Sequence, residues 1–216
     1  MYSLVIKDIL VQKRTVLISL LYIIFLAFML QSLKEGIYPV TISGICYILV
    51  ATACAQDEKN KADVMLNSLP IKRSTIVGAK YVLAIVIFAI GTVAYLAIMQ
   101  AMKFIGLPLQ VYPITLANCL GTLLAISLLN GIYLPIYFKL GYIKSRFINL
   151  ILFFSLFAGI SSIATLLGDS DGLPNLISFV NSYSELQIAI MIVMLTLAIL
   201  ALSYTVSLKV YNSREF

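Results

Sequence analysis

The segment 56–73, QDEKNKADVMLNSLPIKR, holds the residues whose types and spacing are best suited to chemistry in this chain. It begins with acidic residues, continues with apolar residues at helical spacing, and ends in Pro70 and two basic residues. An apolar stripe beside charges is typical of a helix that rests on a protein or membrane surface, so the chemistry predicted is recognition of a partner. The candidate residues are Asp57, Glu58, Ala62, Met65, Leu66, Leu69, Lys72 and Arg73.

Catalytic and cofactor motifs are missing from the sequence. It contains no histidine, and its one Gly-x-Lys, at 78–80, lacks the upstream glycine and the following Ser or Thr of a phosphate-binding loop. The Asp-rich turn at 169–172 lacks the later bidentate Glu of a calcium loop. We therefore expect no catalytic, cofactor-binding or metal-binding residues, and any ATP and Mg²⁺ would be bound by another chain.

The rest of the chain, which must position this segment, has the composition of a transmembrane domain. The sequence is 62% hydrophobic and 11% charged, with a mean hydropathy of +1.04, which is too much apolar surface for one soluble core. Runs of about 20 apolar residues are long enough to cross a bilayer as helices. Six such runs carry no charged residue and predict one all-α, polytopic transmembrane domain over 1–216: residues 15–33, 37–55, 81–102, 112–138, 147–167 and 186–208.

The distribution of Lys and Arg predicts the orientation of these spans. With both termini in the cytoplasm, thirteen of the 15 basic residues lie in cytoplasmic segments, and only Lys34 and Lys103 lie outside. The net charge of +6 then reflects topology and anionic lipid headgroups, so no nucleic-acid partner is expected. The location predicted is the bacterial cytoplasmic membrane, with the loop 56–80 inside and the segment 168–185 outside.

Residues 1–14 predict an interfacial helix. Its apolar face holds Tyr2, Val5, Ile6, Ile9 and Leu10, and its polar residues Ser3, Lys7, Asp8 and Gln12 lie away from that face. The alternative for this segment is an extension of the first span, which would bring charges near hydrocarbon. For the span 15–33, preceded by Lys13 and Arg14, the alternative is a signal peptide, and the sequence lacks a small-x-small cleavage site there.

The loop 56–80 predicts one helix from Asp57 to Leu69. The two acidic residues lie at its N-terminus, where the macrodipole favours anions, and Asp57/Lys61 and Lys59/Asp63 are i,i+4 pairs. Pro70 ends this helix and Ser74 caps the next. The alternative to partner docking is a helix that only rests on the membrane.

Polar residues within the predicted spans are candidates for a translocation pathway or for helix packing. Small and amide side chains commonly hydrogen-bond between membrane helices, which favours packing for most of them. Gly131 and Pro135 predict a kink in the span 112–138, and the spacing of apolar residues 173–180 predicts a short outer helix. The pathway or packing candidates are Asn118, Asn130, Asn149 and Ser155.

One stretch of the chain resembles the first cytoplasmic loop of small bacterial ABC-2-type permeases, such as bacitracin-resistance permeases and the membrane subunits of phenol-soluble modulin exporters. The resemblance lies in DEK at 57–59, LNSLPIKR at 66–73, IV at 76–77 and KY at 80–81. It implies that 57–69 is a coupling helix that docks on a cytosolic ABC ATP-binding subunit. It also implies a second permease subunit, identical or paralogous, and export of amphipathic or antimicrobial peptides.

A second hypothesis from another class stays open at this point. The chain could be a non-transporting membrane immunity or assembly factor whose loop binds a different cytosolic partner. Buried ionisable residues at mid-membrane, which ion-coupled transporters use, are missing from the predicted spans.

Overall fold

The computed structural model describes residues 1–106, 112–168 and 184–214, and the regular elements in these ranges are all helical. This confirms the all-α class. The elements in chain order are α1 (Tyr2–Val11), α2 (Lys13–Met29), the 3-10 helix η1 (Gln31–Gly36), α3 (Ile37–Lys59), α4 (Ala62–Ser68), α5 (Arg73–Phe104), α6 (Leu116–Gly168) and α8 (Glu185–Asn212).

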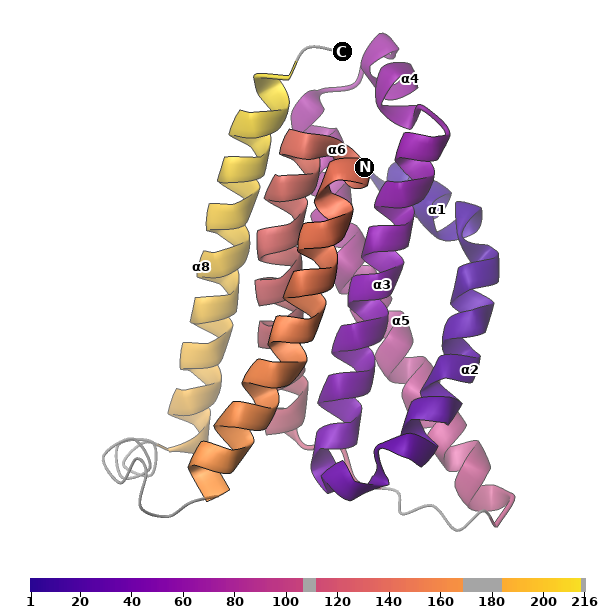
Figure 1. Ribbon diagram of the computed structural model, residues 1–216, viewed down its shortest axis with the longest axis vertical. Coiled ribbons are helices and arrows are strands. Elements are labelled where there is room, and N and C mark those ends of the chain that lie inside the picture. The colour runs from indigo at the N-terminus through magenta and orange to yellow at the C-terminus, as the bar shows by residue number, and fades with distance from the viewer. Residues whose placement is uncertain (107–111, 169–183, 215–216) are drawn as a thin grey trace.

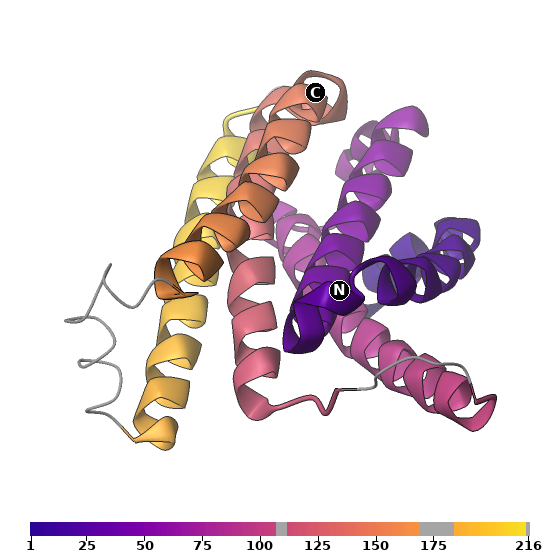
Figure 2. The same cartoon turned by 60° about the horizontal axis from the view of Figure 1, so that its bottom comes forward.

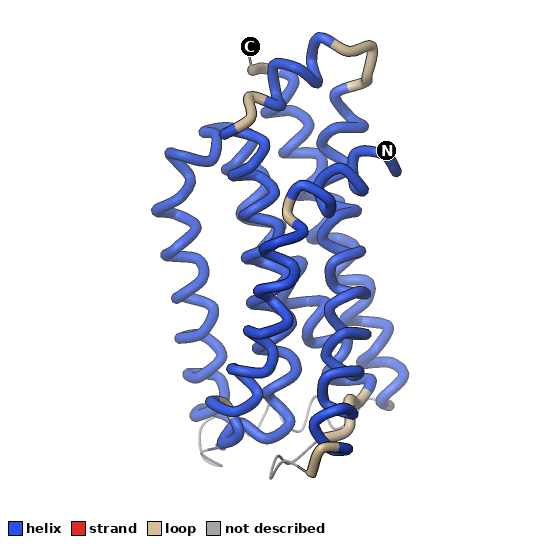
Figure 3. Tube along the Cα trace, turned by 90° about the vertical axis from the view of Figure 1, so that its right-hand side faces the viewer, coloured by secondary structure: helices blue, strands red, loops and turns tan. Residues whose placement is uncertain are grey.

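The long helices form one bundle, and α4 lies with both chain termini at the same end of it (Figures 1 and 3). We call this end the α4 end. Figure 2 shows α3 between the α1–α2 pair on one side and α6 and α8 on the other. The contacts agree, because α3 packs against α2, α5 and α6, while α8 packs against α5 and α6.

Helix α3 is the centre of the bundle, and α8 lies at its periphery. The most apolar 18-residue window of α3 is 83% buried, compared with 11% for that of α8. Small residues such as Gly44, Cys46 and Cys54 let the neighbouring helices approach α3 closely. The apolar surface of α8 is therefore left to lipid or to another chain.

Helix α6 consists of two arms that reverse direction at Gly141, and the second arm runs back beside the first (Figure 1). Gly141 has φ 76° and ψ 174°, a conformation that glycine adopts readily and other residues do not. Gly131 and Pro135, where the sequence predicts a kink, lie inside the first arm with helical dihedral angles, and the break in the helix falls at Gly141.

Among the described residues, length and composition identify four helices that could cross a membrane, or five if the bent pair α1 and α2 is one span. These helices are α3, α5, the part of α6 from Leu116 to Ile148, and α8. A multi-pass membrane protein is thus confirmed. The six spans and their orientation remain predictions.

The loop helix differs from its prediction. Asp57 and Glu58 belong to the last turn of α3, and α4 begins only at Ala62, after Lys61 has adopted a left-handed conformation with φ 49°. The stop at Pro70 is confirmed, since Leu69 is extended with φ −86° and ψ 153°. The predicted Ser74 cap is wrong because Lys72 is the N-cap of α5.

The N-terminal helix is turned differently from the interfacial prediction. Asp8 and Gln12, placed on its outer face, are buried against the bundle, whereas Tyr2 and Leu10 are exposed. A bend of 69° separates α1 from α2. The inward face of α1 therefore carries polar groups that need partners inside the protein.

Candidate coupling site

Four charged side chains from three helices form a closed ring near the α4 end. Lys80 Nζ lies 2.7 Å from Asp8 Oδ2 and 2.5 Å from Asp57 Oδ2. Lys7 Nζ lies 2.7 Å from Asp57 Oδ1 and 3.0 Å from Asp8 Oδ1. Each carboxylate thus contacts both ammonium groups, and the ring as a whole is neutral. We call Lys7, Asp8, Asp57 and Lys80 the ionic ring.

The ionic ring joins α1, α3 and α5 and is largely withdrawn from solvent. The side chains of Lys80, Asp8 and Asp57 are 5%, 3% and 9% exposed, and only that of Lys7, at 34%, reaches the surface. A buried charge without a partner is expensive, so these groups have to stay together. The predicted pair Asp57/Lys61 is wrong, because Asp57 pairs with Lys80 and Lys7.

Glu58 connects the end of α3 to the reversal in α6. Its carboxylate accepts hydrogen bonds from the backbone N–H of Tyr142 and, at 3.4 Å, from that of Ile143. These are free N–H groups at the start of the second arm, where the helix dipole favours an anion. A Cβ at Gly141 would lie 3.0 Å from Glu58 Oε2, so the glycine also makes room for this carboxylate.

A chain of hydroxyl groups ties α5 to α8 and to the first arm of α6. The Tyr81 hydroxyl lies 2.6 Å from Ser203 Oγ and 2.8 Å from Ser207 Oγ. Ser203 Oγ donates in turn to the carbonyl of Gly131 at 2.6 Å. Tyr81 directly follows Lys80 in α5. Lys80 contacts α1 and α3, and Tyr81 contacts α8, so these two consecutive residues connect α5 to both sides of the bundle.

Helix α4 covers the ionic ring. Leu66 is 6% exposed and lies with Asp57 and Lys80 around a narrow gap beneath α4, so its side chain shields the ring from water. Met65 is 65% exposed and Leu69 is 44% exposed, and both face away from the bundle. The predicted apolar face is therefore divided: Leu66 packs inward, Ala62 is half-buried, and Met65 and Leu69 are available to a partner.

The basic residues after α4 have different surroundings. Lys72 is exposed. Arg73 reaches the C-terminal end of α8, where Nη1 donates to the carbonyls of Asn212 at 2.9 Å and Tyr211 at 3.3 Å. A cation near the last carbonyls of a helix stabilises it through the helix dipole. Arg73, the first residue of α5, therefore ties the start of α5 to the end of α8.

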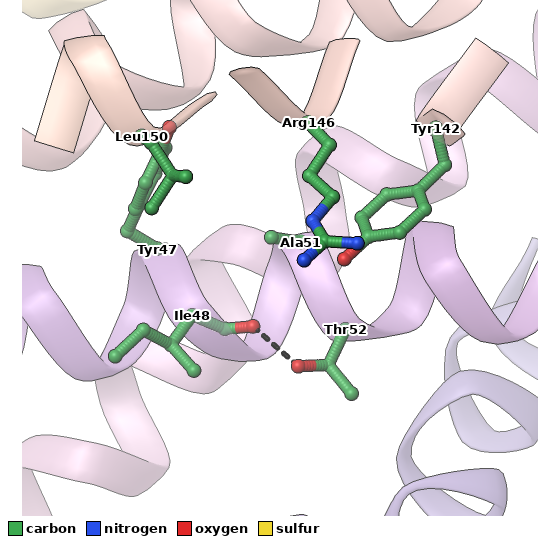
Figure 4. Close-up of a pocket in the computed structure, with 7 residues that line it drawn as sticks. All are labelled: Tyr47, Ile48, Ala51, Thr52, Tyr142, Arg146 and Leu150. Atoms are coloured by element: carbon green, nitrogen blue, oxygen red, sulfur yellow. Dashed lines mark hydrogen bonds between the residues drawn. The ribbon is translucent and has the colours of Figure 1, made fainter. Parts of the chain in front are cut away.

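A groove of about 360 Å³ opens between α3 and the second arm of α6 (Figure 4). In Figure 4, Arg146 and Tyr142 extend toward α3, and the Thr52 hydroxyl donates to the carbonyl of Ile48 at 2.7 Å. Arg146 forms no ion pair with any residue that the structure describes. This combination of an apolar wall and a free guanidinium suits an amphipathic ligand. The lining residues are Tyr47, Ile48, Ala51, Thr52, Tyr142, Arg146 and Leu150.

The described polar candidates of the spans differ in their surroundings. Asn130 is buried, and its Nδ2 donates to the carbonyl of Ile126 in its own helix at 3.1 Å, whereas Asn118 is half-buried. Ser155 is exposed and donates to the carbonyl of Leu152. The side chain of Asn149 and the predicted outer helix at 173–180 lie outside the described residues.

Sequence reasoning missed the ionic ring because its members are far apart in the chain. The sequence signal for such a buried ion pair is that Asp8 and Lys80 each interrupt an apolar stretch. Oppositely charged residues at the same end of different spans are candidates for pairing, since each would otherwise be buried alone. No sequence pattern of this kind predicts the contact of Glu58 with the turn at Gly141.

A bundle of apolar helices long enough to cross a bilayer defines a multi-pass helical membrane protein. Within 1–106, 112–168 and 184–214, no cluster of His, Cys, Asp and Glu could hold a metal ion. The family model of the ABC-2 family transporter proteins matches residues 3–212. The chain therefore belongs to this family, which confirms the resemblance. Comparisons with curated proteins and with solved structures gave no match.

Proposed function

We propose that this chain is the permease subunit of an ATP-driven exporter, with α4 as the helix that docks on a cytosolic ATP-binding subunit. The observation that carries the proposal is the position of α4. It exposes Met65 at the end of the bundle while Leu66 packs on the ionic ring. A push on α4 would thus reach α1, α3 and α5 through one set of buried contacts.

The contacts of Glu58 extend this path to the groove. The second arm of α6, which starts at the backbone groups that Glu58 binds, carries Tyr142 and Arg146 into the groove. A displacement of the end of α3 would therefore change the distance between the two walls. This is the kind of coupling that a transporter driven from outside the membrane needs.

The groove supports amphipathic peptides as the substrate class. Tyr47, Ile48 and Leu150 offer apolar contacts, and Arg146 offers a charge for a carboxylate or a phosphate. The groove is open on one side, so a second permease subunit, identical or paralogous, would supply the missing wall. The same arrangement would cover part of the apolar surface that the bundle leaves exposed.

The decisive experiment separates docking from folding. Met65→Asp places a charge in an apolar contact, where an unpaired buried charge costs several kcal/mol, so it should abolish binding of the ATP-binding subunit without changing the amount of folded permease. Asn60→Asp adds the same charge at an exposed position just before α4 and should bind normally. The readouts are co-purification of a protein with a nucleotide-binding P-loop, stimulation of its ATPase by the permease, and export of peptide from vesicles.

Normal co-purification and normal export by Met65→Asp would contradict the docking role of α4. Loss of both activities in Asn60→Asp as well would show a general effect of charge. If wild-type protein retains a different cytosolic partner and no ATPase, the immunity or assembly function takes the place of transport.

A further inference from the structure

A second cavity, of about 90 Å³, lies between α2, α3 and α5, whereas the groove of Figure 4 lies between α3 and the second arm of α6. It begins at the bend between α1 and α2 and follows one face of α2 from Gln12 to Ile23. Its walls are aliphatic, and Gly91 and Ala94 of α5 leave space along one of them. The walls consist of Ile9, Gln12, Val16, Ser19, Leu20, Ile23, Ile45, Leu49, Ile87, Ile90, Gly91 and Ala94.

Gln12 is one of two polar residues in this lining, together with Ser19. It is 2% exposed, and neither its Nε2 nor its Oε1 has a hydrogen-bond partner among the described residues. Leaving a buried polar group unpaired costs the full desolvation of that group, and buried amides in folded proteins are nearly always satisfied. The Gln12 amide therefore indicates a missing partner that enters the cavity.

Water alone is a poor filling for this cavity. A buried water molecule needs two to four polar partners and about 10 to 15 Å³, so a cavity of this size would hold several. The lining offers them only Gln12 and Ser19 as polar side chains, and Ser19 Oγ already donates to the carbonyl of Val16 at 2.7 Å. A long apolar group with one polar end matches the lining better.

The lining residues along α2 span about the depth of one membrane leaflet. Helix α2 from Gln12 to Ile23 is about 16 Å long at a rise of about 1.5 Å per residue. Half of a bilayer hydrocarbon core of about 30 Å is about 15 Å. Lys13 and Arg14 follow Gln12 and are exposed, so this end of the cavity is at the level of anionic headgroups.

We infer that this cavity binds one acyl chain of a glycerophospholipid. The Gln12 Nε2 donates to the ester carbonyl, which sits just below the headgroup, and a hydroxyl or ammonium of the headgroup donates to Oε1. The acyl chain then lies along α2 toward Ile23. The lipid fills the space between α2, α3 and α5 and holds the bent pair α1–α2 against the bundle. This inference depends on the chain being embedded in a membrane and not on its transport function.

The test compares two lipids by native mass spectrometry of the full chain, delipidated in detergent. One is an ester-linked phosphatidylglycerol, and the other is its ether-linked analogue of equal chain length, which lacks the carbonyl. Wild type should bind the ester lipid about three- to tenfold more tightly, the ratio that one hydrogen bond provides. Gln12→Leu should bind both lipids equally.

Ala94→Phe should fill the cavity and weaken the binding of both lipids about tenfold or more. Ala97→Phe, on the exposed face of the same helix, should bind them as wild type does. If Ala94→Phe is not recovered as a monodisperse protein, Ala94→Leu replaces it. The inference is overturned if Ala94→Phe retains lipid as wild type does. It is also overturned if wild type binds both lipids equally or if Gln12→Leu keeps the preference for the ester.

Discussion

Replacing Lys80 with methionine is the most direct test of the ionic ring. Methionine keeps the unbranched shape of the side chain and removes its charge, so packing in α5 changes little. Asp8 and Asp57 then share a single cation, Lys7, and the ring carries one excess negative charge in a buried place. We expect α1 to separate from α3 and α5 in part of the population.

The size of the effect follows from the geometry. Removing one partner of a buried ion pair costs about 3 to 5 kcal/mol, because the remaining charge is left without compensation. Lys7 still lies 2.7 Å from Asp57 and 3.0 Å from Asp8, which places Lys80→Met near the lower limit. Lys7→Met should cost less, about 1 kcal/mol, because that side chain is 34% exposed and partly screened by water.

A double variant makes the test specific to charge. Adding Asp57→Asn to Lys80→Met restores a neutral ring of Lys7 and Asp8, so about 2 kcal/mol of the loss should return. The free energy of unfolding would be measured by SDS titration in mixed micelles, with the far-ultraviolet circular dichroism of the helices as the signal. A Lys80→Met protein as stable as wild type, or a double variant less stable than Lys80→Met, would refute the reasoning.

Three further predictions concern the reversal of α6, the hydroxyl contacts of Tyr81 and the orientation of the chain in the membrane. Gly141→Ala should lower the free energy of unfolding by about 1 to 3 kcal/mol in the same titration, because alanine is strained at φ 76° and crowds Glu58. Tyr81→Phe should cost about 1 to 3 kcal/mol by removing two buried hydrogen bonds, and it should leave co-purification of the ATP-binding subunit unchanged. A cysteine introduced by Lys61→Cys should react with an impermeant maleimide only from the cytoplasm and one introduced by Ser170→Cys only from outside, and the reverse pattern would invert the topology.

The helical class could be predicted because apolar runs without charge permit only helices in a bilayer. The stop after α4 could also be predicted, since Pro70 restricts the residue before it and Leu69 is extended. The start of α4 could not. Asp57 and Glu58 read as favourable for a helix N-terminus, but tertiary contacts with Lys80 and with the second arm of α6 keep them at the end of α3.

The orientation of α1 shows why the remainder was beyond sequence reasoning. A helical projection assumes that apolar side chains face the protein or lipid and polar ones face water. Beside a membrane bundle the apolar side chains can face lipid, so Asp8 and Gln12 turn inward to partners that periodicity does not reveal. The sequence places Lys80 in the cytoplasmic loop 56–80, as if it faced water. Its two carboxylate partners are 23 and 72 residues away in the chain, so local sequence does not reveal them.

Helix α5 is the element on which these contacts converge. Lys80 connects it to α1 and α3 through charges, and Tyr81 connects it to α8 and α6 through hydroxyl groups. Consecutive residues of a helix point about 100° apart, so a rotation of α5 cannot move one set of contacts without moving the other. Because α5 begins within a few residues of α4, a partner that tilts α4 acts first on this pair, and both sides of the bundle should respond together.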